Sequence, residues 1–230
     1  MSDNEKRPLT SEAYDVIKKR IIDLNYRPGE VLFTQQLANE LMISRTPVRE
    51  ALVKLCQDGL LRQTDSRKFQ VTAITKESIS EIYSLRRCFE IMAAENVFAE
   101  ISDSDIEIMQ GIIEKMKECL KTKEVDAFFK MDNDFHQHLI RKYNNQFLVS
   151  FVNQLLDHQQ RIRYVTYYVS NRMEDTIEEH QQIVEQIKAG DLKGTNDAIA
   201  RHLQKAESET IAFLDSKDFA ILSNVHTIKL

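Results

Sequence analysis

The sequence predicts a mostly α-helical protein in which a small N-terminal winged helix-turn-helix with a β wing precedes an all-α antiparallel helical bundle. Glycine and proline, the residues that most often interrupt helices, are rare: the 230 residues include 5 Gly and 3 Pro, and the stretch Ile79–Ser102 contains neither. Short alternating runs typical of strands occur over residues 61–72, between stretches where apolar residues recur at helical spacing. We therefore expect a first domain over residues 1–75 and a second, helical domain over residues 76–230.

The first domain shows the order of elements expected of a winged helix-turn-helix. Helical periodicity runs over Thr10–Leu24. Thr34 and Ser44 are predicted N-caps of two short helices, because each hydroxyl can accept a hydrogen bond from the first helical turn. The alternating runs Leu61–Thr64 and Phe69–Thr72 follow, and we expect them to pair as a two-stranded wing.

The helix that begins after Ser44 carries the residues that favour nucleic-acid binding. Arg45 and Arg49 are four positions apart, so both stand on one face of the helix. Each guanidinium can donate two hydrogen bonds to guanine in the major groove. Ser44 and Thr46 lie at the helix N-terminus, where hydroxyls and backbone N–H groups suit a phosphate. A bare Arg-x-x-x-Arg is more often a pair of solvated charges, so the interpretation depends on the surrounding helices and wing.

Charge and composition limit the possible partners and location. Residues 1–75 hold 12 Lys and Arg against 10 Asp and Glu, whereas the remainder holds 19 against 26. The chain is acidic overall, but nucleic acid requires only one positive face. The N-terminus is not a signal peptide, and no apolar run reaches the roughly 18 residues that span a bilayer. Three unpaired, widely spaced cysteines fit a reduced compartment. We expect a cytoplasmic protein without membrane contact.

The second domain is predicted to consist of six helices joined by short connections. Their expected bounds are Glu77–Ile101, Asp103–Thr122, Val125–Tyr143, Gln146–Val169, Met173–Ala189 and Leu192–Leu214. The last residues, Lys217–Leu230, show no clear period and receive no assignment.

Three histidines and one aspartate in this domain predict a metal site. Asp132 and His136 are four positions apart on an otherwise apolar helical face, and His180 and His202 each lie in an apolar stripe. The turn at Gly190-Asp191 is about equally far from His180 and His202, which places both about 15 Å along the arms of a helical hairpin. Such a set suits a divalent transition metal, with zinc as first choice and nickel or manganese as alternatives. The alternative is that each histidine is a hydrogen-bonded core residue.

Arg86 is the candidate residue for an anionic ligand. It lies on the apolar stripe of its helix, whereas Arg87 lies outside it. A buried guanidinium needs an anion, and a carboxylate matches its planar fork. A salt bridge to Glu90, one turn away, is the alternative partner. His138, by contrast, is expected on the outer surface.

Several motifs resemble one bacterial family. Pro28-Gly29-Glu30, Leu37-Ala38 and the stretch Ser44–Leu52 resemble the winged helix-turn-helix of GntR regulators. The downstream helices resemble the FCD effector domain of the FadR-like group. The marks of that domain are Leu85-Arg86, Glu90, Ala93-Ala94, Asp132, Phe135-His136, Glu179-His180, Gly190-Asp191 and Arg201-His202-Leu203.

The resemblance implies further contacts and a ligand. It implies that Gln35 also touches DNA, and that Arg67 and Lys68 at the wing tip enter the adjacent minor groove. The family usually has glycine where Lys68 stands, so a clash with DNA and an added phosphate contact both remain open. The resemblance also implies that a small carboxylic acid fills the open positions of the metal, with Arg86 holding its other end.

These observations predict a DNA-binding transcription regulator, with repression as the expected direction, and not an enzyme. One DNA-binding domain covers a half-site, so we expect a homodimer on a roughly palindromic double-stranded operator. A metal sensor without an organic effector is the main alternative. A metal-dependent hydrolase is a remote one, because no motif places a general base beside the metal set.

Overall fold

The computed structural model describes residues 8–166 and 172–216, and within these ranges every side chain except 154 and 163–166. The described residues form two compact units that divide between Thr75 and Lys76. Each unit is described by itself below. The N-terminal residues before 8, the short segment 167–171 and the predicted tail from 217 to 230 lie outside the described residues.

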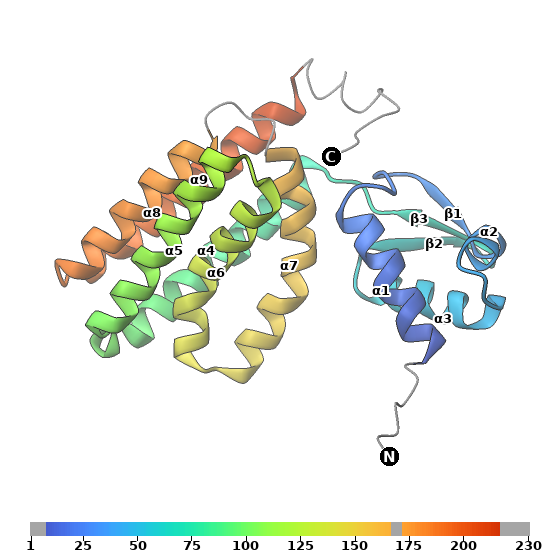
Figure 1. Ribbon diagram of the computed structural model, residues 1–230, viewed down its shortest axis with the longest axis horizontal. Coiled ribbons are helices and arrows are strands. Elements are labelled where there is room, and N and C mark those ends of the chain that lie inside the picture. Colours follow the sequence, from blue (N-terminus) through green and yellow to red (C-terminus); the bar gives the residue numbers. More distant parts are fainter. Residues whose placement is uncertain (1–7, 167–171, 217–230) are drawn as a thin grey trace. The chain divides into compact units, whose positions relative to one another are not determined.

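The first unit is a winged helix-turn-helix. Its elements are α1 (Leu9–Ile22), β1 (Val31–Phe33), α2 (Thr34–Glu40), α3 (Arg45–Gln57), β2 (Leu61–Asp65) and β3 (Lys68–Val71). The strands make an antiparallel sheet in the order β1-β3-β2, with Leu32 opposite Phe69 and Leu61 opposite Val71 (Figure 1). The fold class predicted from the sequence is confirmed.

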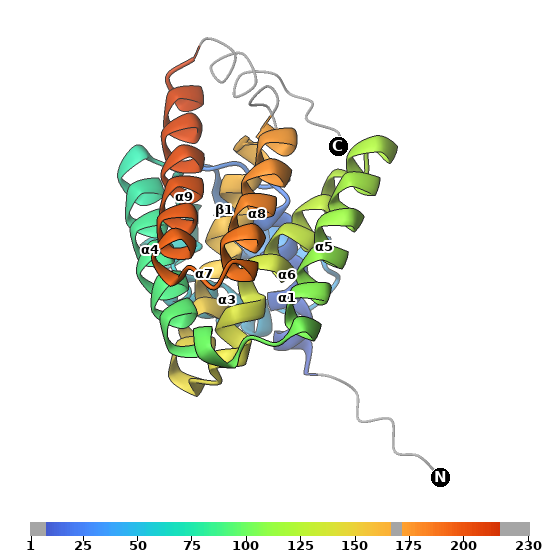
Figure 2. The same cartoon turned by 90° about the vertical axis from the view of Figure 1, so that its left-hand side faces the viewer.

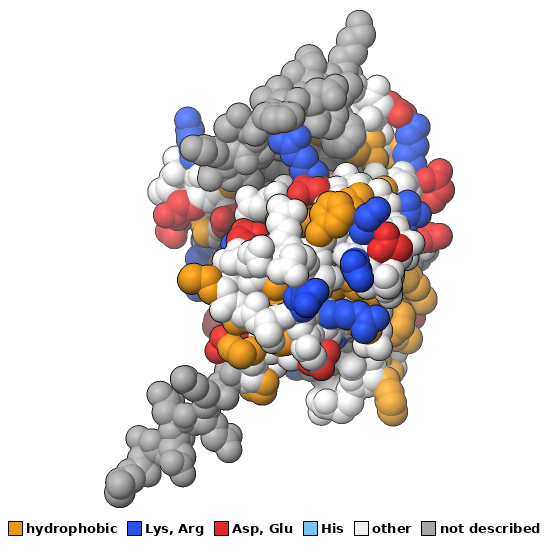
Figure 3. Space-filling model, turned by 90° about the vertical axis from the view of Figure 1, so that its right-hand side faces the viewer, with side chains coloured by type: hydrophobic (Ala, Val, Ile, Leu, Met, Phe, Trp, Pro, Cys, Tyr) orange, Lys and Arg blue, Asp and Glu red, His pale blue; other side chains and the backbone are white. Residues whose placement is uncertain are grey.

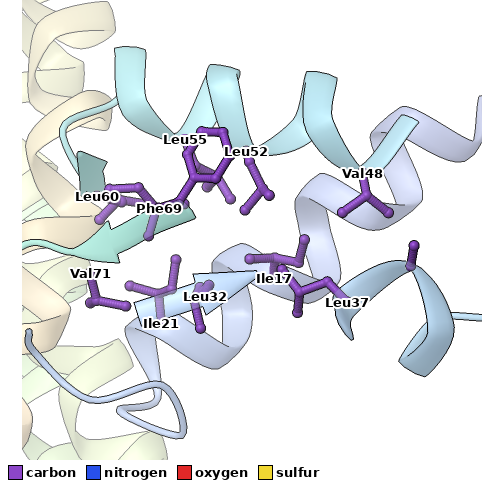
Figure 4. Packing of buried hydrophobic residues seen from close by; sticks show 12 residues of the cluster. Ile17, Ile21, Leu32, Leu37, Val48, Leu52, Leu55, Leu60, Phe69 and Val71 are labelled. Atoms are coloured by element: carbon purple, nitrogen blue, oxygen red, sulfur yellow. The ribbon is translucent and has the colours of Figure 1, made fainter. Parts of the chain in front are cut away.

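One apolar core holds α1, α3 and the sheet together. Ile17, Leu52 and Phe69 come from these three elements and are all fully buried, with their side chains pointing toward one another (Figure 4). This packing fixes the buried face of α3. Because Val48 and Leu52 face the core, Arg45, Thr46 and Arg49 on the opposite side of the helix are left at the surface.

Three local details of this unit differ from what the sequence predicted. Strand β1 was not predicted, because three residues carry little alternation and their pairing with β3 is a long-range contact. Thr34 is the first residue of α2 rather than its N-cap, and its hydroxyl donates to the carbonyl oxygen of Arg67 at 3.4 Å. Ser44 does occupy the N-cap position of α3, but its side chain accepts no capping hydrogen bond.

The second unit is an antiparallel helical bundle, as predicted. Its described helices are α4 (Lys76–Val97), the short 3₁₀ helix η1 (Phe98–Glu100), α5 (Asp103–Thr122), α6 (Val125–Tyr143), α7 (Gln146–Thr166), α8 (Arg172–Lys188) and α9 (Leu192–Leu214). Helix α4 packs on α6, α7 and α9, while α8 packs on α5 and α9 (Figures 1 and 2). None of the described helices combines the length and apolarity that crossing a bilayer requires.

Helix α5 begins with a capping box that also ties it to α6. The Ser102 hydroxyl accepts from the Asp105 backbone N–H, and the Asp105 carboxylate accepts from the Ser102 backbone N–H at 2.8 Å. The same carboxylate lies 3.1 Å from His138 Nε2 and 3.0 Å from Lys142 Nζ, both on α6. His138 is therefore half-buried and paired, not on the outer surface as expected.

Asp105 should contribute to stability in a pH-dependent way. Burial raises the pKa of its carboxyl, but hydrogen bonds from Ser102 and the charge of Lys142 outweigh this and lower the pKa well below the usual 3.8. A carboxyl with a depressed pKa stabilises the folded state above its ordinary pKa and loses that contribution as the pH falls below it. We expect Asp105→Asn to lower the free energy of unfolding by about 1 kcal/mol at pH 7.

Chemical denaturation of the wild type and Asp105→Asn at pH 7 and pH 3 measures this contribution. The difference between the two proteins should shrink at the lower pH. An equal difference at both values would show that the carboxylate charge contributes nothing.

Candidate functional site

Three histidine side chains meet in the interior of the helical unit. His136 on α6, His180 on α8 and His202 on α9 are all buried. The Nε2 atom of His136 lies 3.2 Å from the Nε2 atoms of both His180 and His202. Asp132, one turn before His136, places Oδ1 at 3.6 Å from the Nε2 atoms of His136 and His180. The structure thus brings together all four residues that the sequence predicted as metal ligands.

Hydrogen bonds to two glutamates set the tautomers of two of these rings. The Nδ1 atom of His136 is 2.7 Å from Glu90 Oε2, and the Nδ1 atom of His202 is 2.6 Å from Glu179 Oε2. A carboxylate accepts hydrogen bonds, so each Nδ1 carries the hydrogen. When such a ring is neutral, its lone pair is on Nε2. The Nε2 lone pairs of His136 and His202 then face each other across 3.2 Å.

The charges around the rings favour ionised carboxylates and neutral imidazoles at two positions. Burial raises the pKa of Glu90, but the positive charges of His136 and Arg86 outweigh it and lower the pKa to about 2. Burial also raises the pKa of Glu179, and hydrogen bonds from His202 and Arg172 then lower it to about 2. Burial lowers the pKa of His202 to about 4 and, with the neighbouring imidazoles, that of His180 well below its usual value.

The Nε2 atom of His136 is the point on which the other three polar groups converge. Burial lowers the pKa of His136, but the charge of Glu90 and the hydrogen bonds to Asp132 and Glu90 together outweigh burial, so this pKa lies above its ordinary value. One proton on His136 Nε2 could bond to a single neighbour, while His180, His202 and Asp132 all surround that atom. A metal cation among the four groups can bind all of them together.

The ring of His180 is oriented by packing, and no carboxylate binds its Nδ1 atom among the described residues. Its ring stacks on Phe135 with a centroid separation of 3.9 Å and an interplanar angle of 10°. Its Nδ1 atom is buried and has no hydrogen-bond partner among the described residues. The stack leaves Nε2 pointing to His136.

Arg86 lies beside the cluster, where one part of its guanidinium is paired and another is not. Its Nε donates to Glu90 Oε1 at 3.0 Å, which is the predicted alternative salt bridge. Its Nη2 remains buried without an acceptor among the described residues. A cavity of about 40 Å³ opens between this guanidinium, Asp132, His136 and His202. Arg86 therefore retains a donor for an anion next to the four clustered groups.

A second candidate surface lies on the helix-turn-helix unit. Ser44, Arg45, Thr46 and Arg49 are all exposed at the start of α3. A shallow groove of about 450 Å³ runs along this face of the helix. Both arginines line this groove, and neither forms an ion pair with another described residue. Figure 3 looks at the end of the unit that carries α2 and the wing, and Lys and Arg side chains gather near the centre of that view.

The remaining predicted contact residues lie on α2 and the wing. Gln35 is exposed and donates to Asn39 Oδ1 at 2.8 Å. The Arg67 carbonyl accepts from the Thr34 backbone N–H at 3.3 Å, which ties the wing tip to the start of α2. Lys68 is exposed at the start of β3, and its Nζ atom lies 3.5 Å from Asp65 Oδ2. Its backbone is not in the left-handed conformation. Nothing in this unit therefore demands the glycine that the family usually has there.

The sequence prediction missed the residues that orient the ligands. Glu90 and Glu179 were noted as a salt-bridge partner and a family mark, but their hydrogen bonds to His136 and His202 were not foreseen. A signal existed for Glu90, which shares the buried stripe of Arg86. No sequence signal pairs Glu179 with His202, because the two residues are on different helices.

Comparisons with known proteins agree with this architecture. Residues 9–71 match the bacterial regulatory proteins of the gntR family, and residues 81–205 match the FCD domain. The uncharacterized HTH-type transcriptional regulator YdhC of Bacillus subtilis is 28% identical over 196 residues, covering 85% of this chain and 88% of that protein. The HTH-type transcriptional repressor RspR of Escherichia coli is 24% identical over 202 residues, covering 88% and 89%.

Two solved structures are similar to the chain. The structure of McbR/YncC from E. coli has a TM-score of 0.72 at 23% identity and covers 90% of this chain and 99% of its own. The Zn²⁺-bound FCD domain of TM0439 has a TM-score of 0.50 at 25% identity and covers 62% and 98%. The first similarity shows the shared fold.

A winged helix-turn-helix followed by a helical bundle of this type is the architecture of a class of DNA-binding transcription regulators. The chain belongs to the GntR family of bacterial regulatory proteins, with an FCD domain as its second part. This family and the relatives named above are transcription regulators and not enzymes. The prediction that the chain is not an enzyme is therefore confirmed, and the hydrolase alternative is dropped.

Proposed function

We propose that this regulator, acting as a repressor, binds a divalent transition metal and a small carboxylic acid in its helical unit, and that this changes its affinity for the operator. Asp132, His136, His180 and His202 would hold the metal, and Arg86 would hold the acid. The observation that carries the proposal is the convergence of three Nε2 atoms, two of which have lone pairs directed at each other by Glu90 and Glu179.

The donor set fits zinc, with nickel or manganese as alternatives. Two nitrogens that are each about 2.0–2.1 Å from one zinc ion lie roughly 3 Å apart, and the observed separation is 3.2 Å. Three imidazoles and one carboxylate also suit nickel and manganese. The Zn²⁺-bound FCD domain of TM0439 supports zinc as the first choice. When bound, the metal would neutralise Asp132 and attract a second carboxylate.

The exposed face of α3 is proposed to read the operator. Arg45 and Arg49 would donate to guanine in the major groove, while Ser44 and Thr46 would contact a phosphate. Gln35, Arg67 and Lys68 would extend the contact from α2 and the wing, and the hydrogen bond between Thr34 and Arg67 would keep these parts in register. One such surface covers a half-site, so a homodimer on a roughly palindromic operator is the proposed assembly.

Helix α4 is the proposed connection between the two units. It begins at Lys76, directly after the first unit ends, and it carries both Arg86 and Glu90. Through Glu90 it is hydrogen-bonded to His136, so occupancy of the metal and acid site acts on this helix. The acid can change operator affinity only if it binds one arrangement of α4 more tightly than another.

A metal sensor without an organic effector is a second candidate. The cavity beside Arg86 is about 40 Å³, which holds a few water molecules rather than an acid. In the first candidate the acid must enlarge this cavity when it binds. In the second candidate the metal alone changes operator affinity.

The metal site can be tested by the zinc content of variants. We expect about one zinc per chain in the wild type after reconstitution, and little in a variant that combines His180→Ala with His202→Ala, because two of the three nitrogen ligands are gone. Elemental mass spectrometry of dialysed protein measures this content. His138→Ala is the matched control, because His138 lies on the same helix as His136 but pairs with Asp105. Equal zinc in all three proteins, or none in any, would contradict the site.

The reading surface can be tested on a duplex selected from a random library by the full-length protein. We expect Arg45→Ala and Arg49→Ala each to weaken binding by roughly 5- to 150-fold, because one bidentate base contact is worth about 1–3 kcal/mol. Fluorescence anisotropy at fixed salt measures the affinity. Lys19→Ala is the control, because Lys19 pairs with Asp23 on α1. Unchanged affinity in both arginine variants would move the reading surface away from α3.

A comparison of effectors separates the two candidates for the signal. Operator affinity is measured with metal-free protein, with zinc-loaded protein, and with zinc-loaded protein plus short carboxylic acids. A change that requires the acid supports the first candidate. A change that is complete with zinc alone supports the metal sensor.

A further inference from the structure

Arg172, the first residue of α8, is a second buried arginine in the helical unit. Only 4% of its surface is exposed. Its Nη1 and Nη2 atoms donate to the two carboxylate oxygens of Glu179, at 3.0 Å to Oε1 and 2.8 Å to Oε2. Nη1 also donates to Glu209 Oε2 at 3.2 Å. The two parallel bonds fix both the position and the plane of the Glu179 carboxylate.

The carboxylate that Arg172 holds is the one that orients His202. Glu179 Oε2 lies 2.6 Å from His202 Nδ1 and accepts its hydrogen. With Nδ1 fixed in this way, Nε2 of His202 points to His136. Arg172 Nη2 is 3.5 Å from His202 Nδ1, but both of these nitrogens carry hydrogens. The arginine therefore acts on the imidazole through Glu179.

The same order of groups, arginine to glutamate to histidine, occurs at His136. There Arg86 Nε donates to Glu90, and Glu90 holds the Nδ1 hydrogen of His136. In both places a buried arginine neutralises a buried glutamate. Without such a countercharge, a buried carboxylate becomes protonated or moves toward solvent, and it no longer holds its imidazole in place.

Lys205 is the other cation on Glu179, and it lies on the outside. Its Nζ atom is 3.1 Å from Glu179 Oε1 and 2.7 Å from Asp175 Oδ2, and its side chain is 44% exposed. An ion pair with an exposed lysine is screened by water and contributes little. If Arg172 were removed, this outer cation would draw the carboxylate away from His202.

We propose that Arg172 is a positioning residue for the metal, because it holds Glu179 and thereby directs His202. This inference rests on the proposed metal site. Charge alone acts in the opposite direction, since a guanidinium repels a nearby cation. Arg172 favours the metal only while the charge of Glu179 cancels its own. Removal of Arg172 should therefore weaken metal binding when Glu179 is present, and should not do so when Glu179 has lost its charge.

Zinc affinity in a double-mutant cycle tests this inference. The four full-length proteins are the wild type, Arg172→Met, Glu179→Gln and the variant with both substitutions, and competition with a fluorescent zinc chelator measures each Kd. We expect Arg172→Met alone to weaken zinc binding roughly 10-fold. In the Glu179→Gln background the same substitution should change the Kd by less than about 3-fold, because no carboxylate remains for Arg172 to hold.

Two further variants control for effects on the fold. Arg172→Lys keeps the charge but loses the two parallel bonds, so it should recover part of the affinity. It also replaces Arg172→Met in both backgrounds if that variant does not fold. Arg87→Met is the matched control and should bind zinc as the wild type does, because Arg87 Nη1 donates to Glu207, at 2.6 Å, in a similar arginine–glutamate pair.

The outcomes separate this inference from the proposed function. A similar loss of affinity in both backgrounds would show that Arg172 only supports the fold, and no loss in either would show that Glu179 does not need it. Each of these results overturns the inference and leaves the metal site in place. A wild-type protein that binds no zinc overturns the metal site itself.

Discussion

The helical unit depends on two carboxylate–imidazole hydrogen bonds. Glu90 holds the Nδ1 hydrogen of His136 and Glu179 holds that of His202, and both carboxylates stay ionised although they are buried. Each bond turns an Nε2 lone pair inward, to where His180 and Asp132 also point. Four polar groups from three helices are then directed at one place, where burial is costly unless each group finds a partner.

The same contacts connect the histidine cluster to helix α4. Glu90 and Arg86 are on α4, while the histidines are on α6, α8 and α9, so the site joins four helices of the bundle. Helix α4 follows the helix-turn-helix unit directly along the chain. It is therefore the shortest covalent connection between the histidine cluster and that unit. In the helix-turn-helix unit, the apolar core determines which face of α3 is exposed.

Much of this could be predicted from the sequence, for physical reasons that differ between elements. The bounds of α5, α6 and α9 match the prediction, because capping residues and sharp turns mark their ends. The four proposed ligands could be found because polar residues on apolar stripes stand out. Strand β1 and the Glu179–His202 bond could not, because both depend on partners distant in sequence. The sequence offered a salt bridge to Glu90 and a free guanidinium as alternatives for Arg86. It could not show that Nε is paired while Nη2 is not.

X-ray absorption spectroscopy of the zinc-reconstituted protein tests the central claim most directly. If Glu90 and Glu179 direct the histidine Nε2 atoms at one ion, the spectrum should show three imidazole nitrogens at about 2.0–2.1 Å, with oxygen completing the shell. A sulfur ligand at about 2.3 Å, or a shell with one imidazole or none, would contradict the account. In that case His136, His180 and His202 would be core residues that share protons, and the bundle would sense its signal elsewhere.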